Sequence, residues 1–504
     1  MPNTSSVWSL ENPVRAGAPL AGNTRYDVCV IGGGIAGLTT AYLLASEGKS
    51  VVVLDAKPTV AGGETEFTTA HLAWVIDDRF ARVASIRGDD TAALAAKSHL
   101  AAINLIEEII KRENIACDFR RTDGYLFPGA RGGDEVIRDE VVALTRLGLI
   151  FERVDQVPFP ASATGPALRF PDNGQFHPLK YLSEIAALIR KNGGAIHTDT
   201  QVVKVENGSP CVAHTKSGHA VTADAIVVAT NTPFDAGLSL HFKLAAYITY
   251  AIALEVPAGY VPPVLLWDTE DPYHYVRTAH GTGTEFLIVG GEDHKTGQAQ
   301  DQQERWDRLE AWARKRFPEA GPVRHHWSGQ VFETPDGLGL IGRAPGFRDN
   351  LYVITGDSGM GMTHGTLGAR LVTDLILGRT SEFAGVYSPS RWMPGALKTL
   401  LEENANLAAQ YGDWLTGGEV KSAAEIPPGH GAIIRHGLSK SAAYKDDKGQ
   451  VHEMSAVCPH LGGIVQWNPG EKSWDCPCHG SRFSCKGEVQ HGPAVEGLKV
   501  IEKT

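Results

Sequence analysis

The 504-residue sequence lacks several features that would define its class at once. It has no apolar run approaching the roughly 20 residues that a membrane-spanning helix needs. Its net charge is −11 and it has no long basic run, so nucleic acid is not expected as a partner. It also has no internal repeat and no low-complexity tract. These absences favour an ordinary globular protein of about two or three domains.

Cysteine is scarce as well. The chain has seven cysteines, and they are scattered rather than arranged as a disulfide framework, which favours a reducing compartment. The first residues, MPNTSSVWSLENP, contain neither a basic segment nor an apolar one, so they are unlike a secretory signal. We therefore expect a cytoplasmic protein without a membrane span.

Spacing singles out four residues near the C-terminus. One residue separates Cys458 from His460, and two residues separate Cys476 from His479. A thiolate and an imidazole this close together can sit on one tight loop and point the same way. Two such loops can close over a [2Fe–2S] cluster in which two imidazoles replace two thiolates on one iron. We predict that Cys458 and Cys476 bind one iron, and that His460 and His479 bind the other.

The segment that contains these residues resembles the Rieske family over about residues 425–504. The resemblance rests on CPHLGG, CPCHGSRF and GPA, and it implies an electron carrier that moves one electron at a time. High-potential members have a cysteine where this chain has Gly463 and a tyrosine where it has Phe483. These differences imply a potential in the lower part of the Rieske range, about −150 to +300 mV. A structural zinc site is the alternative, although zinc ligands usually come as CxxC or HxxxH pairs.

The N-terminal part carries a nucleotide-binding pattern. The expected elements are an apolar strand over residues 28–31, a helix to about residue 46 and a second strand over residues 51–54. The residues that complete the pattern are Gly32, Gly34, Gly37 and Asp55. The glycines allow a tight turn and bring a pyrophosphate close to the helix N-terminus, and the acid accepts a hydrogen bond from a ribose hydroxyl. The pattern predicts a bound dinucleotide without a 2′-phosphate.

A second motif favours FAD over NAD. Residues 350–361, NLYVITGDSGMG, place a strand before Gly356 and Asp357, and a helix follows. This motif resembles the second FAD motif of glutathione-reductase-like flavoproteins, in which the aspartate binds the ribityl chain and the helix N-terminus faces the flavin. The strand ADAIVVATN, residues 223–231, resembles the returning strand of the same group. Further FAD contacts are expected at Thr69, Val203, Gly361 and Met362.

Residues 24–385 resemble the D-amino-acid-oxidase group, which includes glycine and sarcosine oxidases. Besides the glycine fingerprint, the resemblance is carried by residues 63–72, 174–178, 334–337 and 340–342. It implies an α/β FAD-binding domain of the glutathione-reductase-like Rossmann type with an inserted α+β substrate domain, followed by a small all-β Rieske domain. The expected boundaries are 24–390 for the oxidoreductase domain, about 85–165 and 245–330 for its insertions, 391–424 for a connector and 425–504 for the Rieske domain.

The sequence offers few candidates for the substrate chemistry. Lys295 matches the lysine that sits near the flavin in sarcosine oxidase and helps O2 to react. His274 and His294 lie on predicted strands that could face the flavin, and a solvated lysine and structural histidines are the alternatives. The arginine that clamps the substrate carboxylate in amino-acid oxidases has only Arg277 and Arg343 as candidates. Both amino acids and simple amines therefore stay open as substrates.

Together these features predict a FAD-dependent oxidoreductase that oxidises a small molecule at a C–N bond. A flavin takes two electrons and can release them singly, whereas the cluster takes one, so we expect a relay through the cluster to an unknown external acceptor. The first alternative is a reductase of a partner oxygenase that NAD(P)H feeds, although a second nucleotide fingerprint is missing. The other alternative is a non-enzymatic redox sensor.

Overall fold

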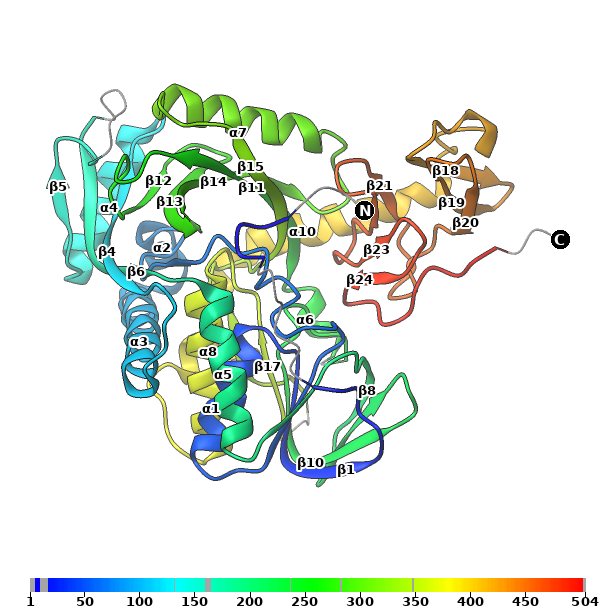
Figure 1. The fold of residues 1–504 in the computed structure, drawn as a ribbon, viewed down its shortest axis with the longest axis horizontal. Coiled ribbons are helices and arrows are strands. Elements are labelled where there is room, and N and C mark those ends of the chain that lie inside the picture. The colour runs from blue at the N-terminus through cyan, green and yellow to red at the C-terminus, as the bar shows by residue number, and fades with distance from the viewer. Residues whose placement is uncertain are drawn as a thin grey trace.

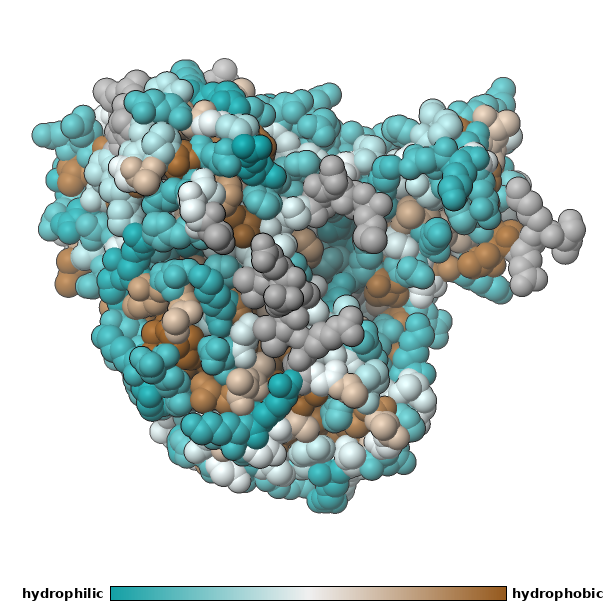
Figure 2. Space-filling model, viewed as in Figure 1, coloured by the Kyte–Doolittle hydropathy of each residue, from teal (hydrophilic) through white to brown (hydrophobic). Residues whose placement is uncertain are grey.

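The structure is a computed structural model that describes residues 5–9, 17–130, 132–158, 165–235, 237–281, 283–346 and 349–501. Figure 1 shows a helix-backed sheet at the bottom, a second sheet above it and a small β domain at the side. This arrangement confirms the predicted fold class. Among the described helices, none is both long and apolar enough to cross a membrane. Figure 2 shows that this face of the molecule is mainly hydrophilic.

The first sheet is built around the N-terminal glycine pattern. Its strands follow the order β16-β17-β10-β1-β2-β7, and all neighbours are parallel except β16 and β17. Continuous Val/Ile runs suit strands that are covered on both faces, as in β2. The strands are β1 (Thr24–Ile31), β2 (Val51–Leu54), β7 (Ala195–His197), β10 (Ala220–Val228), β16 (Leu340–Arg343) and β17 (Leu351–Thr355), with β8 (Val202–Glu206) and β9 (Cys211–Thr215) continuing from β10.

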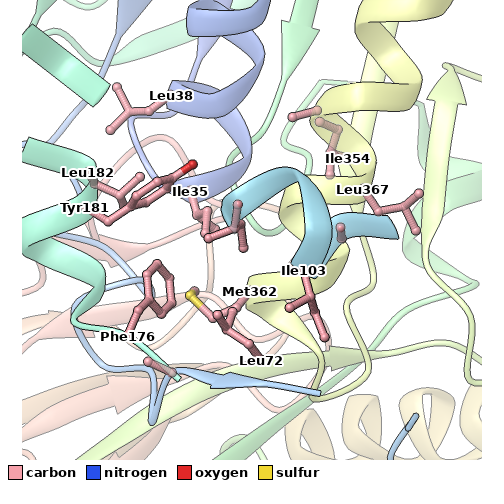
Figure 3. Close-up of a cluster of buried hydrophobic side chains, with 14 of the residues drawn as sticks. Ile35, Leu38, Leu72, Ile103, Phe176, Tyr181, Leu182, Ile354, Met362 and Leu367 are labelled. Atoms are coloured by element: carbon pink, nitrogen blue, oxygen red, sulfur yellow. The ribbon is translucent and has the colours of Figure 1, made fainter. Parts of the chain in front are cut away.

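Three helices that are distant in sequence pack together beside this sheet. They are α1 (Ile35–Ser46), α5 (Pro178–Lys191) and α8 (Gly361–Ile376). Figure 3 shows how side chains from each helix, such as Ile35, Tyr181 and Met362, gather in one apolar cluster. This packing fixes the N-termini of α1 and α8, which carry the two predicted cofactor motifs.

The second sheet forms the inserted part. Its strands follow the order β15-β11-β14-β13-β12-β4-β6-β3, and β5 pairs with β6. The strands are β3 (His71–Leu72), β4 (Arg120–Phe127), β5 (Glu152–Val154), β6 (Ala167–Gln175), β11 (Ala245–Val256), β12 (Leu265–Asp268), β13 (His274–Gly281), β14 (Thr284–Lys295) and β15 (Val323–Glu333). Strand β6 therefore belongs to this sheet, although it lies just beyond the insertion expected over about residues 85–165. Its pairing with β4 and β3, both distant in sequence, determines this place.

Helices and the small domain complete the fold. Helix α7 (Gln302–Arg316) lies over the second sheet, and α10 (Leu397–Gln410) leads from the main body towards the small domain (Figure 1). Other helices are α2 (Phe80–Arg87), α3 (Asp89–Glu113), α4 (Gly133–Leu147), α6 (Leu238–His241) and α9 (Ala384–Tyr387). The strands of the small domain are β18 (His430–His436), β19 (Ser439–Lys445) and β20 (Val451–Ser455) in one sheet, and β21 (Gln466–Asn468), β22 (Ser473–Asp475), β23 (Arg482–Ser484) and β24 (Val489–His491) in the other.

Candidate functional site

A cavity of about 770 Å³ lies where the two large sheets and the small domain meet. Its volume falls within the range of about 300–1,000 Å³ that is usual for ligand sites. The first sheet contributes the Gly32 turn, the second sheet contributes Thr249 and Tyr275, and the small domain contributes Gln490 and His491. All three parts of the chain therefore shape one site.

The three glycines of the N-terminal nucleotide-binding pattern have different roles at this cavity. Gly32 has φ +107°, and a Cβ there would lie 2.4 Å from the carbonyl oxygen of Ala229. A Cβ at Gly37 would lie 1.9 Å from the carbonyl oxygen of Gly32, so α1 packs directly on the turn before it. Gly32 and Gly34 line the cavity, whereas Gly37 acts by allowing this close packing.

Asp55 lies at the edge of the cavity, where β2 ends. Its carboxylate accepts hydrogen bonds from the backbone N–H groups of Gly33 and Lys57, the second at 2.7 Å. Burial raises the pKa of Asp55 above its usual value. The two backbone bonds hold the side chain in one orientation beside the glycine turn, the place that the sequence pattern gives to the ribose-binding acid.

Most of the other predicted cofactor contacts line the same cavity. They are Thr69, Asp357, Gly361 and Met362. Gly356 is in the turn before Asp357, with φ +70°, and does not line the cavity itself. Val202 lines it in place of Val203, because neighbouring residues of a strand point to opposite faces.

Polar atoms in the cavity wall fit a cofactor rich in hydrogen-bonding groups. Within the described residues, the Oδ1 atom of Asp357, the Oγ1 atom of Thr232 and the Nε2 atom of His364 are buried and have no hydrogen-bond partner. All three residues line the cavity. Burial raises the pKa of Asp357 to about 7. Since buried polar groups are normally paired, these atoms indicate that a polar ligand belongs here.

The predicted cluster ligands converge in the small domain. Cys458 and Cys476 are each 2% exposed, and the rings of His460 and His479 have centroids 5.1 Å apart. In the described part of the chain, no group of three or more His, Cys, Asp or Glu side chains is arranged so that it could hold a single metal ion. A cluster that shares two cysteines and two histidines between two irons needs no such triad. A Cβ at Gly463 would lie 2.5 Å from the sulfur of Cys478 and 3.2 Å from the sulfur of Cys476, so glycine leaves room for both cysteines.

The oxidoreductase part covers the histidine side of this ligand set. His241, at the end of α6, is 4% exposed, and its ring centroid lies 4.7 Å from that of His460 and 5.6 Å from that of His479. Gln330 of β15 lines the cavity and donates from Nε2 to the carbonyl oxygen of Gly480 at 2.7 Å. His241 and Gln330 could not be predicted from the sequence, because neither lies in a motif and both make their contacts across domains.

Further bonds attach the small domain to the cavity wall. The Nδ1 atom of His491 lies 2.8 Å from the Glu64 carboxylate, and Lys57 donates to the carbonyl oxygen of Gln490 at 2.9 Å. Gln201 donates to the carbonyl oxygen of Val495 at 2.9 Å. The small domain is therefore docked on the cofactor side of the larger part by several polar contacts.

Comparison with known proteins identifies both parts. The model of the FAD dependent oxidoreductase (DAO) family matches residues 27–375, and the model of the Rieske [2Fe-2S] domain matches residues 418–502. The chain belongs to the FAD dependent oxidoreductase family. It is an enzyme of the amino-acid and amine oxidase type, and it uses FAD and a Rieske [2Fe–2S] cluster. The predicted enzyme class and cofactors are thereby confirmed.

Individual relatives agree with this assignment. The putative Rieske 2Fe-2S iron-sulfur protein YhfW of Bacillus subtilis is 30% identical and matches 99% of this chain and 97% of its own length. The gamma-glutamylputrescine oxidoreductase of Escherichia coli is 26% identical over 76% of this chain and 92% of its own. Glycine oxidase from Geobacillus kaustophilus has a similar fold, with a TM-score of 0.61 at 19% identity over 73% of this FAD-dependent oxidoreductase and 99% of that chain.

The three residues expected to act on the substrate lie outside the cavity wall. Lys295 forms an ion pair of 2.7 Å with Glu403 of α10. The Nδ1 atom of His274 lies 2.9 Å from the Asp268 carboxylate. The Nε2 atom of His294 lies 2.9 Å from the hydroxyl of Tyr250, and burial lowers the pKa of His294 to about 4. Each has a partner in the protein, so their positions do not support a role beside the flavin.

The two candidate carboxylate clamps are also placed elsewhere. Arg277 is 3% exposed, and its guanidinium donates to the backbone carbonyls of Ala70 and Phe176. Arg343 is exposed on β16. Neither side chain lines the cavity. Neither of these two arginines is therefore placed to bind a substrate carboxylate in the cavity.

Acidic and aromatic side chains from the second sheet form the roof of the cavity. Asp293 of β14 and Glu333 of β15 line it together with Tyr273 and Tyr275. The pKa of Asp293 and that of Glu333 are each raised to about 7, mainly by burial and in part by the negative charge of neighbouring acids.

The Asp293 carboxyl should make the stability of the protein depend on pH. Its pKa in the folded protein is raised from 3.8 to about 7. Its contribution to stability is therefore fully present below about pH 4 and is lost as the pH rises through about 7. Asp293→Asn removes this loss. The Tm of the variant minus that of the wild type should then be larger at pH 8 than at pH 5, by roughly 2 °C or more.

Thermal unfolding of both proteins at the two pH values checks this result. The matched control is Glu184→Gln, since Glu184 is an exposed acid on α5, far from the roof. Its Tm difference from the wild type should be the same at both pH values. A pH-independent difference for Asp293→Asn would contradict the assignment.

Proposed function

We propose that the enzyme oxidises a C–N bond of a small amine or amino acid and sends the electrons singly through the Rieske cluster to an external acceptor. When bound, FAD supplies two-electron chemistry and the cluster supplies one-electron transfer. The observation that carries the proposal is the docking of the small domain. Its residues form part of the cavity wall, and the histidine side of its ligand set faces the oxidoreductase part.

One side chain connects the two sites directly. Gln330 is 3% exposed, lines the cavity and donates to the carbonyl oxygen of Gly480, the residue after the ligand His479. His241 packs against both ligand rings beside it. A continuous chain of contacts, with no solvent gap at Gln330, thus links the cofactor cavity to the cluster loop. Such contacts keep donor and acceptor close and in a fixed orientation.

The relatives support the substrate side of the proposal. The Escherichia coli relative is named for the oxidation of gamma-glutamylputrescine, a compound with an oxidisable C–N bond. The relative that matches the whole chain carries the Rieske part as well. Anaerobic screening of amines and amino acids, with the flavin and cluster absorbance followed together, tests the substrate class. A substrate that reduces the flavin should also reduce the cluster.

Replacing Gln330 by leucine should slow electron transfer between the two sites. The substitution keeps the size of the side chain but removes the bond to Gly480. After photoreduction of the flavin, the cluster should be reduced roughly tenfold more slowly, because a small loss of positioning has large effects on a reaction step. Because Gly480 adjoins a ligand, the electron paramagnetic resonance spectrum of the reduced cluster should also shift.

Gln201→Leu is the matched control for this experiment. It removes a bond of the same kind to the small domain, but at Val495 rather than beside a cluster ligand. Its transfer rate and cluster spectrum should stay close to those of the wild type. Equal slowing in both variants would indicate a general effect on docking, and no slowing in Gln330→Leu would contradict the path through this residue.

A further inference from the structure

We infer that the substrate is a cationic amine with a second positive charge remote from the nitrogen that is oxidised, such as a diamine or polyamine. The inference rests on the proposed function and names its substrate class. The residues that carry it lie in the part of the cavity wall outside the two FAD motifs. The acids of this part are Asp77, Asp78, Glu270, Asp271, Asp293 and Glu333, and Arg79 is the basic side chain that lines it beside them.

Within the described residues, neither Asp293 nor Glu333 forms an ion pair with a basic side chain. In the part of the chain that the structure describes, the Oδ1 atom of Asp293 is buried and has no hydrogen-bond partner. The basic groups nearest to Asp293 and Glu333 are already engaged with other carboxylates. These pairs are Arg82 with Asp78, Lys295 with Glu403 and Arg305 with Asp301. Buried carboxylates without a counter-charge are costly, and a cationic ligand would remove that cost.

Aromatic rings stand beside these acids. Tyr273, Tyr275 and Trp267 line the same part of the cavity, and the two tyrosine rings have centroids 5.4 Å apart. The Tyr273 hydroxyl donates to the Asp77 carboxylate at 2.9 Å, so the ring is held next to the acid. Aromatic faces attract ammonium groups, especially where water is excluded. Acids and rings together therefore favour an organic cation over an anion.

The charge of the roof also argues against a substrate carboxylate. Arg277 and Arg343 are not in the cavity, and Arg79, the basic side chain that does line this part, stands among acids that outnumber it, so a carboxylate would meet more negative than positive charge. A site that places like charges together excludes the wrong ligand as effectively as attraction selects the right one. An amino-acid substrate, with its carboxylate beside the reacting carbon, fits this wall poorly.

A second positive charge follows from the chemistry of the reaction. Oxidation of a CH–NH group to C=N removes two electrons and two protons, which the established FAD chemistry takes up, and water then hydrolyses the imine. The nitrogen must be neutral to be oxidised, because its lone pair has to be available. A neutral nitrogen does not offset the negative charge of Asp293 and Glu333, whereas a second ammonium group of the substrate does.

Three amines with the same four-carbon skeleton test this inference on the complete enzyme with both cofactors bound. They are 1,4-diaminobutane, butylamine and 4-aminobutanoate, in which the carbon farthest from the shared amino group is an aminomethyl, methyl or carboxylate carbon. Binding is measured anaerobically from the change in the flavin spectrum, and flavin reduction is measured by stopped flow. The diamine should bind roughly 10- to 100-fold more tightly than butylamine, as expected for a charged hydrogen bond. 4-Aminobutanoate should bind most weakly.

Variants of the roof provide the second part of the test. Asp293→Asn and Glu333→Gln should each reduce the preference for the diamine over butylamine roughly tenfold or more while keeping the flavin content. The exposed Glu184→Gln should keep the wild-type preference. The inference is overturned if 4-aminobutanoate binds as tightly as the diamine, or if both roof variants keep the full preference.

The outcomes separate this inference from the proposed function. If amino acids or neutral amines reduce the flavin and the electrons reach the cluster, the proposed function stands and the cationic substrate class fails. If the diamine binds with the predicted preference but does not reduce the flavin, the cationic site stands and the proposed reaction fails. If the diamine neither binds preferentially nor reduces the flavin, the inference is overturned.

Discussion

Cys476→Ser should leave flavin reduction intact and stop the delivery of electrons to a protein acceptor such as cytochrome c. Cys476 is 2% exposed and is one of the two predicted thiolate ligands of the cluster. Serine is a poorer ligand for iron, so the cluster should be lost or altered. Turnover with the acceptor should fall at least about 100-fold, since changes outside the first ligand layer of a metal site already cost 10- to 100-fold.

The experiment combines three measurements on purified protein. Anaerobic mixing with substrate measures reduction of the flavin, and electron paramagnetic resonance measures the content and state of the cluster. Reduction of the acceptor measures electron transfer along the complete path. The matched control is Cys485→Ser, because Cys485 is a partly exposed cysteine of the same domain outside the ligand set. It should retain cluster and turnover. Acceptor turnover that persists in Cys476→Ser would show that electrons leave the flavin by another route.

Gly37→Val should abolish FAD binding. Any Cβ at this position lies 1.9 Å from the carbonyl oxygen of Gly32 and 3.2 Å from the Cγ1 atom of Val30. The first contact is with backbone, so α1 would have to move away from β1, and its N-terminus would leave the place where the pyrophosphate binds. We expect flavin content below about a tenth of the wild-type value, because misplacement by about 1 Å already costs large factors.

Flavin content, from the ratio of flavin to protein absorbance, measures this effect. Gly385→Val is the matched control, because a Cβ at Gly385 would meet nothing within 4 Å and the residue is exposed on helix α9. The control should bind FAD normally. Full flavin content in Gly37→Val would mean that the helix tolerates the shift, and the role assigned to this glycine would be wrong.

Local sequence patterns predicted the parts of the site that depend on backbone geometry. Gly32, Gly34 and Asp55 follow from a strand, a tight turn and a helix that are consecutive in the chain. The fold class also followed, because alternating strands and helices with two glycine-rich turns allow few arrangements. Val203 shows the limit of such reasoning, because a register difference of one residue turns a side chain to the other face of its strand.

The remaining parts of the site depend on contacts between distant segments. Lys295 matched a short motif, yet its place is determined by Glu403, more than a hundred residues later. Gln330 and His241 belong to the site only through their contacts with the small domain. The roof acids come from separate strands, and their common environment arises from the order of those strands in the sheet. No local pattern encodes these pairings.

The place of the small domain has a consequence for how the enzyme is made. Val489, Gln490 and His491 form part of the cofactor cavity, and they lie near the end of the chain. A ribosome produces residues 27–375, with both glycine motifs, well before it produces this part of the wall. During synthesis the cavity is thus open on the side that the small domain later covers. The order of the two domains along the chain gives FAD a route of entry before the enzyme closes around it.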